Sequence, residues 1–360
     1  MQTWAKIVVI VVGVVAVAGF GAYEVVTSTA APDPCAGTTV SNTTASVETP
    51  EPTALASTSS GAVHSSGSSD TAGTTGRAHV AAGSTIQVVA AENFWGSLVS
   101  QLGGNRTSVL SIVTDPNSDP HEYEANTSDA QAIANAQYVI VNGVGYDDWA
   151  LQLISAANTP NQVVLNVGDL NGVSVTGGIV TGNPHMWYNP VYVNRTVAAM
   201  YSNLVSIQPS STAYFQANYA ALNASLGSLY ARANEIRDQF AGAIVASTES
   251  IFVYLANYTH LDLVSPPAFM EAIAEGNDPS AQSVVQFQCQ LESGKVRVLV
   301  YNEQTVTPIT TNMKAIAASN NVTIVGVTET IQPPNVPFQV WMNAEYLQLE
   351  NALNANALGQ

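Results

Sequence analysis

Short β-rich runs alternate with amphipathic stretches from Ile86 to the C-terminus, a pattern typical of α/β domains. The first series has expected strands at 86–91, 108–113, 138–142 and 162–166, and expected helices at 95–102, 128–136 and 147–157. The second series has expected strands at 243–248, 296–301 and 322–327, and expected helices at 251–258, 281–293, 308–318 and 340–353. The sequence therefore predicts an α/β fold of two lobes, each with a small parallel sheet flanked by helices.

One long helix is expected between the two series. Apolar residues recur from Phe215 to Phe240 at alternating spacings of four and three, which marks one face of a helix. Pro209 and the two serines after it supply a start, and at ~1.5 Å per residue the helix would be roughly 40 Å long. Such a rigid helix would join the lobes and restrict hinge motion. The same periodicity also fits a surface helix of one large domain.

The N-terminal part has a different composition. Lys6 precedes an uncharged apolar run from residue 7 to 23, which suits a secretion signal or an N-terminal membrane anchor, and its length favours the anchor. The next stretch is rich in Ser, Thr, Gly and Ala, which predicts a disordered tether. The body is then extracytoplasmic, at the cell surface or in the periplasm. The expected segments are 1–25 (signal or anchor), 26–84 (tether), 85–208 (N-terminal lobe), 209–241 (linking helix) and 242–360 (C-terminal lobe).

The charge balance indicates which partners to expect. Nine Lys and Arg stand against 26 Asp and Glu, a net charge of −17, and the nine cations are scattered singly along the chain. Nucleic acid is therefore excluded as a partner, and cations are the natural ligands, although the acidity also suits any soluble secreted protein. The two cysteines, Cys35 and Cys289, could form one disulfide, and the sequence leaves their pairing open.

Two of the five histidines occupy matching contexts. His121 lies in residues 119–123 (DPHEY) and His185 in residues 183–187 (NPHMW), so each follows a turn that a proline stiffens. Imidazole is the most common protein ligand for transition metals, and the pair indicates a metal or catalytic site. The second histidine of a zinc-protease motif is missing after His121, and no serine-hydrolase, phosphate-loop or dinucleotide motif occurs.

These motifs, taken in order, resemble the periplasmic or surface solute-binding proteins of zinc, manganese and iron ABC importers. The matching segments are 91–95 (AENFW), 102–104 (LGG), 119–124 (DPHEYE), 141–143 (VNG), 183–190 (NPHMWYNP), 248–254 (TESIFVY) and 327–330 (VTET). The resemblance implies a non-enzymatic receptor that captures Mn²⁺, Zn²⁺ or Fe²⁺ between two lobes. It also implies delivery of the ion to an ABC permease and its ATPase. We expect a monomer that reaches the membrane through its N-terminal segment.

Carried over residue by residue, the resemblance implies four metal ligands: His121 and His185 from the first lobe, and Glu249 and Glu329 from the second. The fourth ligand of the family is usually Asp, so Glu329 departs from the pattern, and Glu303 is the reserve candidate. Both expected carboxylate ligands lie just past a predicted strand, where open α/β sheets place their ligands. Two imidazoles and two carboxylates carry a net charge of −2, which favours a divalent cation and excludes anions.

The sequence leaves the metal and two rival functions open. Zn²⁺ binds most such sites more tightly than Mn²⁺ or Fe²⁺, whereas the absence of His from residues 169–182, where zinc-type relatives carry a His-rich loop, favours manganese or iron. The first rival is a surface adhesin on the same scaffold, for which the Ser/Thr-rich tether is the supporting feature. The second is a metal-dependent hydrolase with Glu122 or Glu124 as its base.

Overall fold

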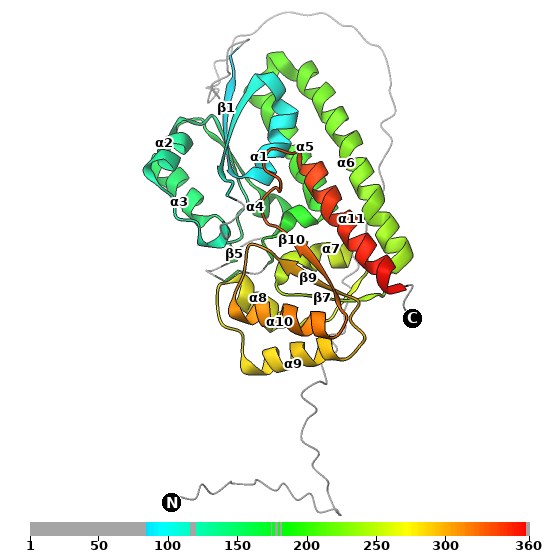
Figure 1. Ribbon diagram of the computed structural model, residues 1–360. Coiled ribbons are helices and arrows are strands. Elements are labelled where there is room, and N and C mark those ends of the chain that lie inside the picture. The colour runs from blue at the N-terminus through cyan, green and yellow to red at the C-terminus, as the bar shows by residue number, and fades with distance from the viewer. Residues whose placement is uncertain (1–83, 116–119, 174, 177–178, 181, 358–360) are drawn as a thin grey trace, which may run out of the picture. The chain divides into compact units, whose positions relative to one another are not determined.

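The computed structural model describes residues 84–115, 120–173, 175–176, 179–180 and 182–357 (Figure 1). The expected signal or anchor, Cys35 and all of the expected tether except Ser84 lie outside these residues. The other cysteine, Cys289, is disulfide-bonded. Within the described ranges, no helix combines the length and the apolar character that a membrane span requires.

Two parallel sheets form the centre of the fold, as predicted; each has four strands, whereas three were expected in the second. The first has the strand order β2-β1-β3-β4, and the second has the order β10-β9-β7-β8. The strands of the first sheet are β1 (Ile86–Glu92), β2 (Thr107–Val113), β3 (Tyr138–Val141) and β4 (Val163–Asn166). Those of the second are β7 (Ile244–Ser247), β8 (Asp262–Leu263), β9 (Val298–Asn302) and β10 (Thr323–Val327). A short antiparallel hairpin, β5 (Val175–Thr176) with β6 (Ile179–Val180), follows the first sheet.

Helices cover both faces of each sheet (Figure 1). Those of the first half are α1 (Asn93–Gly103), α2 (Thr127–Asn135), α3 (Asp148–Ala157), α4 (Val167–Asn171) and α5 (Pro190–Ile207). The long helix α6 (Thr212–Phe240) follows, and then α7 (Val253–Tyr258), α8 (Pro267–Ala274), α9 (Ala281–Glu292), α10 (Pro308–Ser319) and α11 (Phe338–Ala357). The local signals explain the starts: Thr307 caps α10 through Thr310, and Pro308 occupies its first turn.

Side-chain alternation along the strands assigns each face of a sheet to a different core. In β1, Val88 and Ala90 pack into a large core, whereas Val89 and Ala91 pack under α2 and α3. In β9, Leu299 faces a third core that α8, α9 and α10 cover. The large core contains residues from the inner faces of both sheets together with α5, α6 and α11. The two lobes are therefore joined by shared apolar packing as well as by the chain.

Helix α6 confirms the stripe expected from the sequence. Its buried residues are Phe215, Leu222, Leu226, Leu229, Ala233, Ile236 and Phe240. Residues 209–211 form a separate 3-10 turn, so the α-helix begins at Thr212 and runs for 29 residues. At ~1.5 Å per residue this is about 43 Å. Helices α5 and α8 and strand β8 are not among the elements expected from the sequence.

Candidate metal centre

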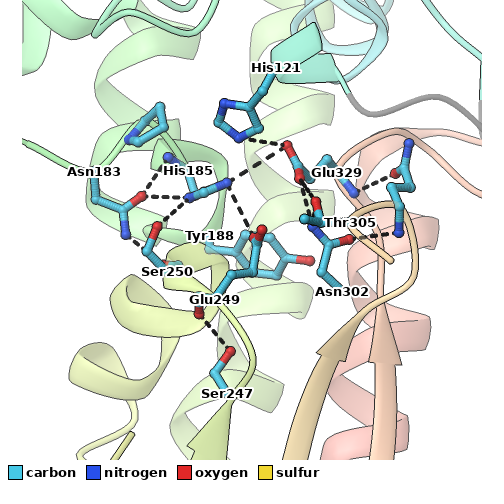
Figure 2. Close-up of polar contacts among 12 residues, drawn as sticks. His121, Asn183, His185, Tyr188, Ser247, Glu249, Ser250, Asn302, Thr305 and Glu329 are labelled. Carbon is cyan, nitrogen blue, oxygen red and sulfur yellow. Dashed lines mark hydrogen bonds and ion pairs between the residues drawn. The ribbon is translucent and has the colours of Figure 1, made fainter. Parts of the chain in front are cut away.

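Four turns, two from each lobe, bring the four expected ligands together (Figure 2). His121 lies in a 3-10 turn, Pro120–Glu122, and His185 directly precedes another, Met186–Tyr188. Glu249 and Glu329 follow the carboxyl ends of β7 and β10 by two residues each. The carboxyl ends of parallel strands lie at one edge of a sheet, which explains how the two carboxylates reach the same place.

Three of the expected ligands, His121, His185 and Glu329, form one close group, and Glu249 contacts this group through His185. Nε2 of His121 is 3.4 Å from Oε2 of Glu329, and Nε2 of His185 is 3.7 Å from the same oxygen. Nε2 of His185 is also 3.6 Å from Oε1 of Glu249. One ligand atom from each of His121, His185 and Glu329 lies within 4.8 Å of the other two. The reserve candidate, Glu303, is exposed, and its carboxylate lies over Gly326 instead.

Burial distinguishes one of the four residues from the other three. The side chains of His185, Glu249 and Glu329 have no exposed surface, whereas that of His121 is 18% exposed. A cleft of about 2010 Å³ is lined by His121 and Tyr146 at this end and continues along α8 and α9. The cluster is therefore an interior site that meets the cleft at His121.

Asn183 fixes the ring of His185 (Figure 2). Its Oδ1 is 2.7 Å from Nδ1 of His185 and also accepts the backbone N–H of His185 at 2.9 Å. The Nδ2 group of Asn183 donates to the carbonyl of Ser250 at 2.6 Å, so Oδ1 is the acceptor and Nδ1 carries the proton. Burial lowers the pKa of His185 below its usual value. The ring is therefore neutral, and Nε2 presents a lone pair to the two carboxylates.

Glu329 is held at both carboxylate oxygens. Asn302 Nδ2 donates to Oε1 at 2.6 Å, and the hydroxyl of Tyr146 donates to Oε2 at 2.7 Å. Gln304 also accepts the backbone N–H of Glu329 at 2.7 Å. Burial acts to raise the pKa of Glu329, but the charge of His121 and the contacts with both imidazoles hold it well below its usual value. The residue is ionised, with Oε2 turned toward the imidazoles.

Four polar residues of this site were not predicted from the sequence: Asn183, Tyr146, Asn302 and Gln304. Asn302 and Gln304 flank Glu303, the reserve candidate for the fourth ligand, in the segment after β9. Asn183 stands two residues before His185, at the spacing of a side chain that accepts a hydrogen bond from the backbone two residues on. This two-residue spacing is the sequence signal from which the role of Asn183 could have been predicted. The aromatic residues Phe94 and Trp187 beside His185 are buried and stack at 4.1 Å between ring centroids.

The arrangement of these side chains suits the binding of a cation more than the catalysis of a reaction. Two imidazoles and two buried carboxylates offer nitrogen and oxygen ligands without thiolate, the donor set that divalent first-row metals accept. Two buried carboxylates are costly without a compensating positive charge, and a divalent ion supplies it. The site thus has the charge and the donor atoms for one divalent cation.

Comparisons with known proteins agree with this architecture. The family model described as "ZnuA: Zinc-uptake complex component A periplasmic" matches residues 88–352. The chain is 30% identical over 142 residues to the manganese-binding lipoprotein MntA of Halalkalibacterium halodurans. The matching region covers 39% of this chain and 45% of the relative. The chain spans about half the length of the curated relatives it matches.

Solved structures share the fold over most of the chain. The crystal structure of a ZnuA protein is 22% identical, with a TM-score of 0.61, and covers 75% of this chain and 99% of its own. The periplasmic zinc-binding protein TroA of Treponema pallidum is 15% identical, with a TM-score of 0.63, and covers the same shares. These likenesses concern the two-lobed fold.

Proposed function

The chain belongs to the ZnuA family of periplasmic zinc-uptake components, and on this basis we propose that it captures one divalent transition metal ion, Mn²⁺, Zn²⁺ or Fe²⁺, between its lobes. The proposed ligands are His121, His185, Glu249 and Glu329. The observation that carries the proposal is their convergence from four separate turns, with ligand-atom separations of 3.4, 3.6 and 3.7 Å.

These separations are consistent with a small tetrahedral centre. In a tetrahedron the edge is ~1.63 times the distance from centre to corner, so edges of 3.4–3.7 Å correspond to metal–ligand distances of about 2.1–2.3 Å. Nitrogen and carboxylate ligands bind Zn²⁺ at about this distance. Oε2 of Glu329 is the oxygen that faces both imidazoles, at 3.4 and 3.7 Å, which supports ligation through this atom.

We propose that the bound ion is cargo and that the receptor delivers it to an ABC permease and its ATPase. Family membership supports this part of the proposal, since the family is one of metal-uptake components and not of enzymes. Its place is then extracytoplasmic, and the protein acts as a monomer that residues 1–25 connect to the membrane. The hydrolase interpretation, with Glu122 or Glu124 as base, is not retained for the same reason.

The decisive experiment is metal titration of chelator-treated protein, by calorimetry and by competition with a fluorescent chelator. The ligand variants His121→Ala, His185→Ala, Glu249→Gln and Glu329→Gln should each weaken Zn²⁺ and Mn²⁺ binding by at least about tenfold, because residues that only support metal ligands already contribute about 10–100-fold. Glu303→Gln is the matched control, since that carboxylate lies outside the cluster. Wild-type protein without measurable affinity, or ligand variants that bind like the control, would refute the proposal.

A surface adhesin on the same scaffold stays a prediction with its own test. Loss of cell binding with intact metal uptake in a deletion strain would support it, whereas loss of metal uptake alone would support the receptor.

A further inference from the structure

A single carboxylate on the last helix contacts both turns that present buried ligands of the proposed metal centre. Glu345 lies in α11 and is 6% exposed. Its Oε2 accepts the hydroxyl of Tyr188 at 2.6 Å, and its Oε1 accepts the backbone N–H of Thr328 at 3.0 Å. Tyr188 belongs to the 3-10 turn that begins directly after His185, and Thr328 is the residue before Glu329. Glu345 therefore contacts the residue before Glu329 and the last residue of the turn that follows His185.

The same contacts close into a small network that spans the two lobes. The Tyr188 hydroxyl also lies 3.2 Å from the carbonyl oxygen of Thr328, so it reaches both Glu345 and the turn of Glu329. The indole N–H of Trp341 donates to Oγ1 of Thr328 at 3.0 Å. The backbone N–H of Thr328 is thus held by Glu345 and its hydroxyl by Trp341, which leaves the turn little freedom to rotate Glu329 away.

Helix α11 is itself fixed against both lobes. It packs along α6 and touches α1 of the N-terminal lobe and β10 of the C-terminal lobe (Figure 1). At its start, the backbone N–H of Phe338 donates to Oγ of Ser97 at 3.0 Å. Farther along, Arg232 of α6 pairs with Glu350 of α11 at 2.6 Å. Glu345 is therefore presented from a rigid platform rather than from a loop.

We propose that Glu345 and Tyr188 are positioning residues that set the distance between His185 and Glu329, and hence the affinity of the metal centre, without touching the ion. The proposal rests on the proposed function of metal capture. Neither side chain is among the ligands, and the hydrogen bond between them joins residues 157 positions apart in sequence. Loss of either partner would let the two ligand turns relax independently, so the pair of ligands would no longer be held at 3.7 Å.

The test compares Tyr188→Phe, Glu345→Met and the double variant with wild type in the full chain; Met is close to Glu in length but makes neither hydrogen bond. Zn²⁺ affinity is measured by chelator competition, and Co²⁺ absorption of the saturated proteins reports ligand geometry. Each single variant should raise the Kd about tenfold or more and alter the Co²⁺ spectrum. The double variant should be no weaker than the weaker single variant, because both substitutions remove the same bond.

Glu350→Met is the matched control, since it makes the same substitution in the same helix but at a residue that contacts neither ligand turn. It should bind Zn²⁺ like wild type. If wild type and control do not bind, the proposed function fails. If both bind and the two positioning variants fold, keep a Kd within twofold of wild type and show an unchanged Co²⁺ spectrum, then the network only stabilises the fold and the inference is overturned.

Discussion

Two buried carboxyl groups of the N-terminal lobe make a prediction about stability and pH. Glu92 ends β1 and Asp147 precedes α3; both are almost fully buried. Burial, and then the charge of Asp147, raises the pKa of Glu92 well above its usual value. Burial also raises the pKa of Asp147 to about 6, although it accepts backbone N–H groups of Asn142 and Gly143 at 2.6 and 2.7 Å. The pair therefore holds a proton, and Glu92 is the group that carries it.

The difference in proton binding between the folded and unfolded states decides whether stability rises or falls with pH. Both groups have folded-state pKa values above their unfolded values, so the native protein binds more protons than the unfolded chain above about pH 4. The free energy of unfolding must therefore fall as the pH rises through this window. For Asp147, a shift from 3.8 to about 6 corresponds to about 3 kcal/mol in total, of which about 1 kcal/mol is lost between pH 5 and pH 7. Glu92 acts in the same direction.

The perturbation is Glu92→Gln. The amide keeps the shape and does not titrate, so the variant lacks the proton that the wild-type protein holds on Glu92 in the folded state. We expect the stability of the variant relative to wild type to improve by about 1 kcal/mol or more from pH 5 to pH 7. Equilibrium urea unfolding of metal-free protein at pH 5, 6 and 7 measures this difference.

Two controls separate this pair from other titrating groups. Burial also raises the pKa of Glu345, to about 7, so wild-type stability alone would not identify the source. Subtracting the two curves removes this contribution. Glu124→Gln makes the same substitution at an exposed position and serves as its control. A difference between Glu92→Gln and wild type that stays constant from pH 5 to pH 7 would refute the reasoning.

Two further predictions concern the linking helix and the metal. Leu226 of α6 is fully buried in the core that both lobes share, so Leu226→Ala should lower the free energy of unfolding by about 2–5 kcal/mol in guanidinium titration. A loss below about 1 kcal/mol would argue that α6 does not carry this core. At the proposed site, Zn²⁺ should displace Mn²⁺ at equilibrium, because mixed nitrogen and oxygen ligands follow the Irving–Williams order. Paramagnetic resonance of released Mn²⁺ measures this, and retention of Mn²⁺ in excess Zn²⁺ would contradict it.

Much of the fold could be predicted from local patterns. The seven expected strands correspond to strands of the two sheets, because buried parallel strands read as runs of β-branched residues. Helix α6 was found from its stripe of apolar residues. Helix α5 was missed although Asn189 caps it and Pro190 opens it, because both residues also belong to the motif around His185. Strand β8 has only two residues, too short for any period to show.

The site could be predicted only in part. The proline turns marked His121 and His185, and the ends of two strands marked the carboxylates, but no local pattern states which distant residues meet. Asn302 beside Glu329, and Tyr188 beside Glu345, are ordinary polar residues in the sequence. Their roles depend on contacts between segments 27 and 157 residues apart. Such contacts arise from how the sheets and α11 pack together and are absent from any short window of sequence.

The unequal exposure of the four proposed ligands sets an order on exchange. His121 alone meets the cleft, while its three companions are sealed in the interior. An ion that leaves the proposed site toward the cleft passes His121, so His121 is the last ligand to release it. A chelator in solution can therefore reach the ion only after the three buried ligands have released it. Tight binding would then result from slow dissociation rather than from fast association.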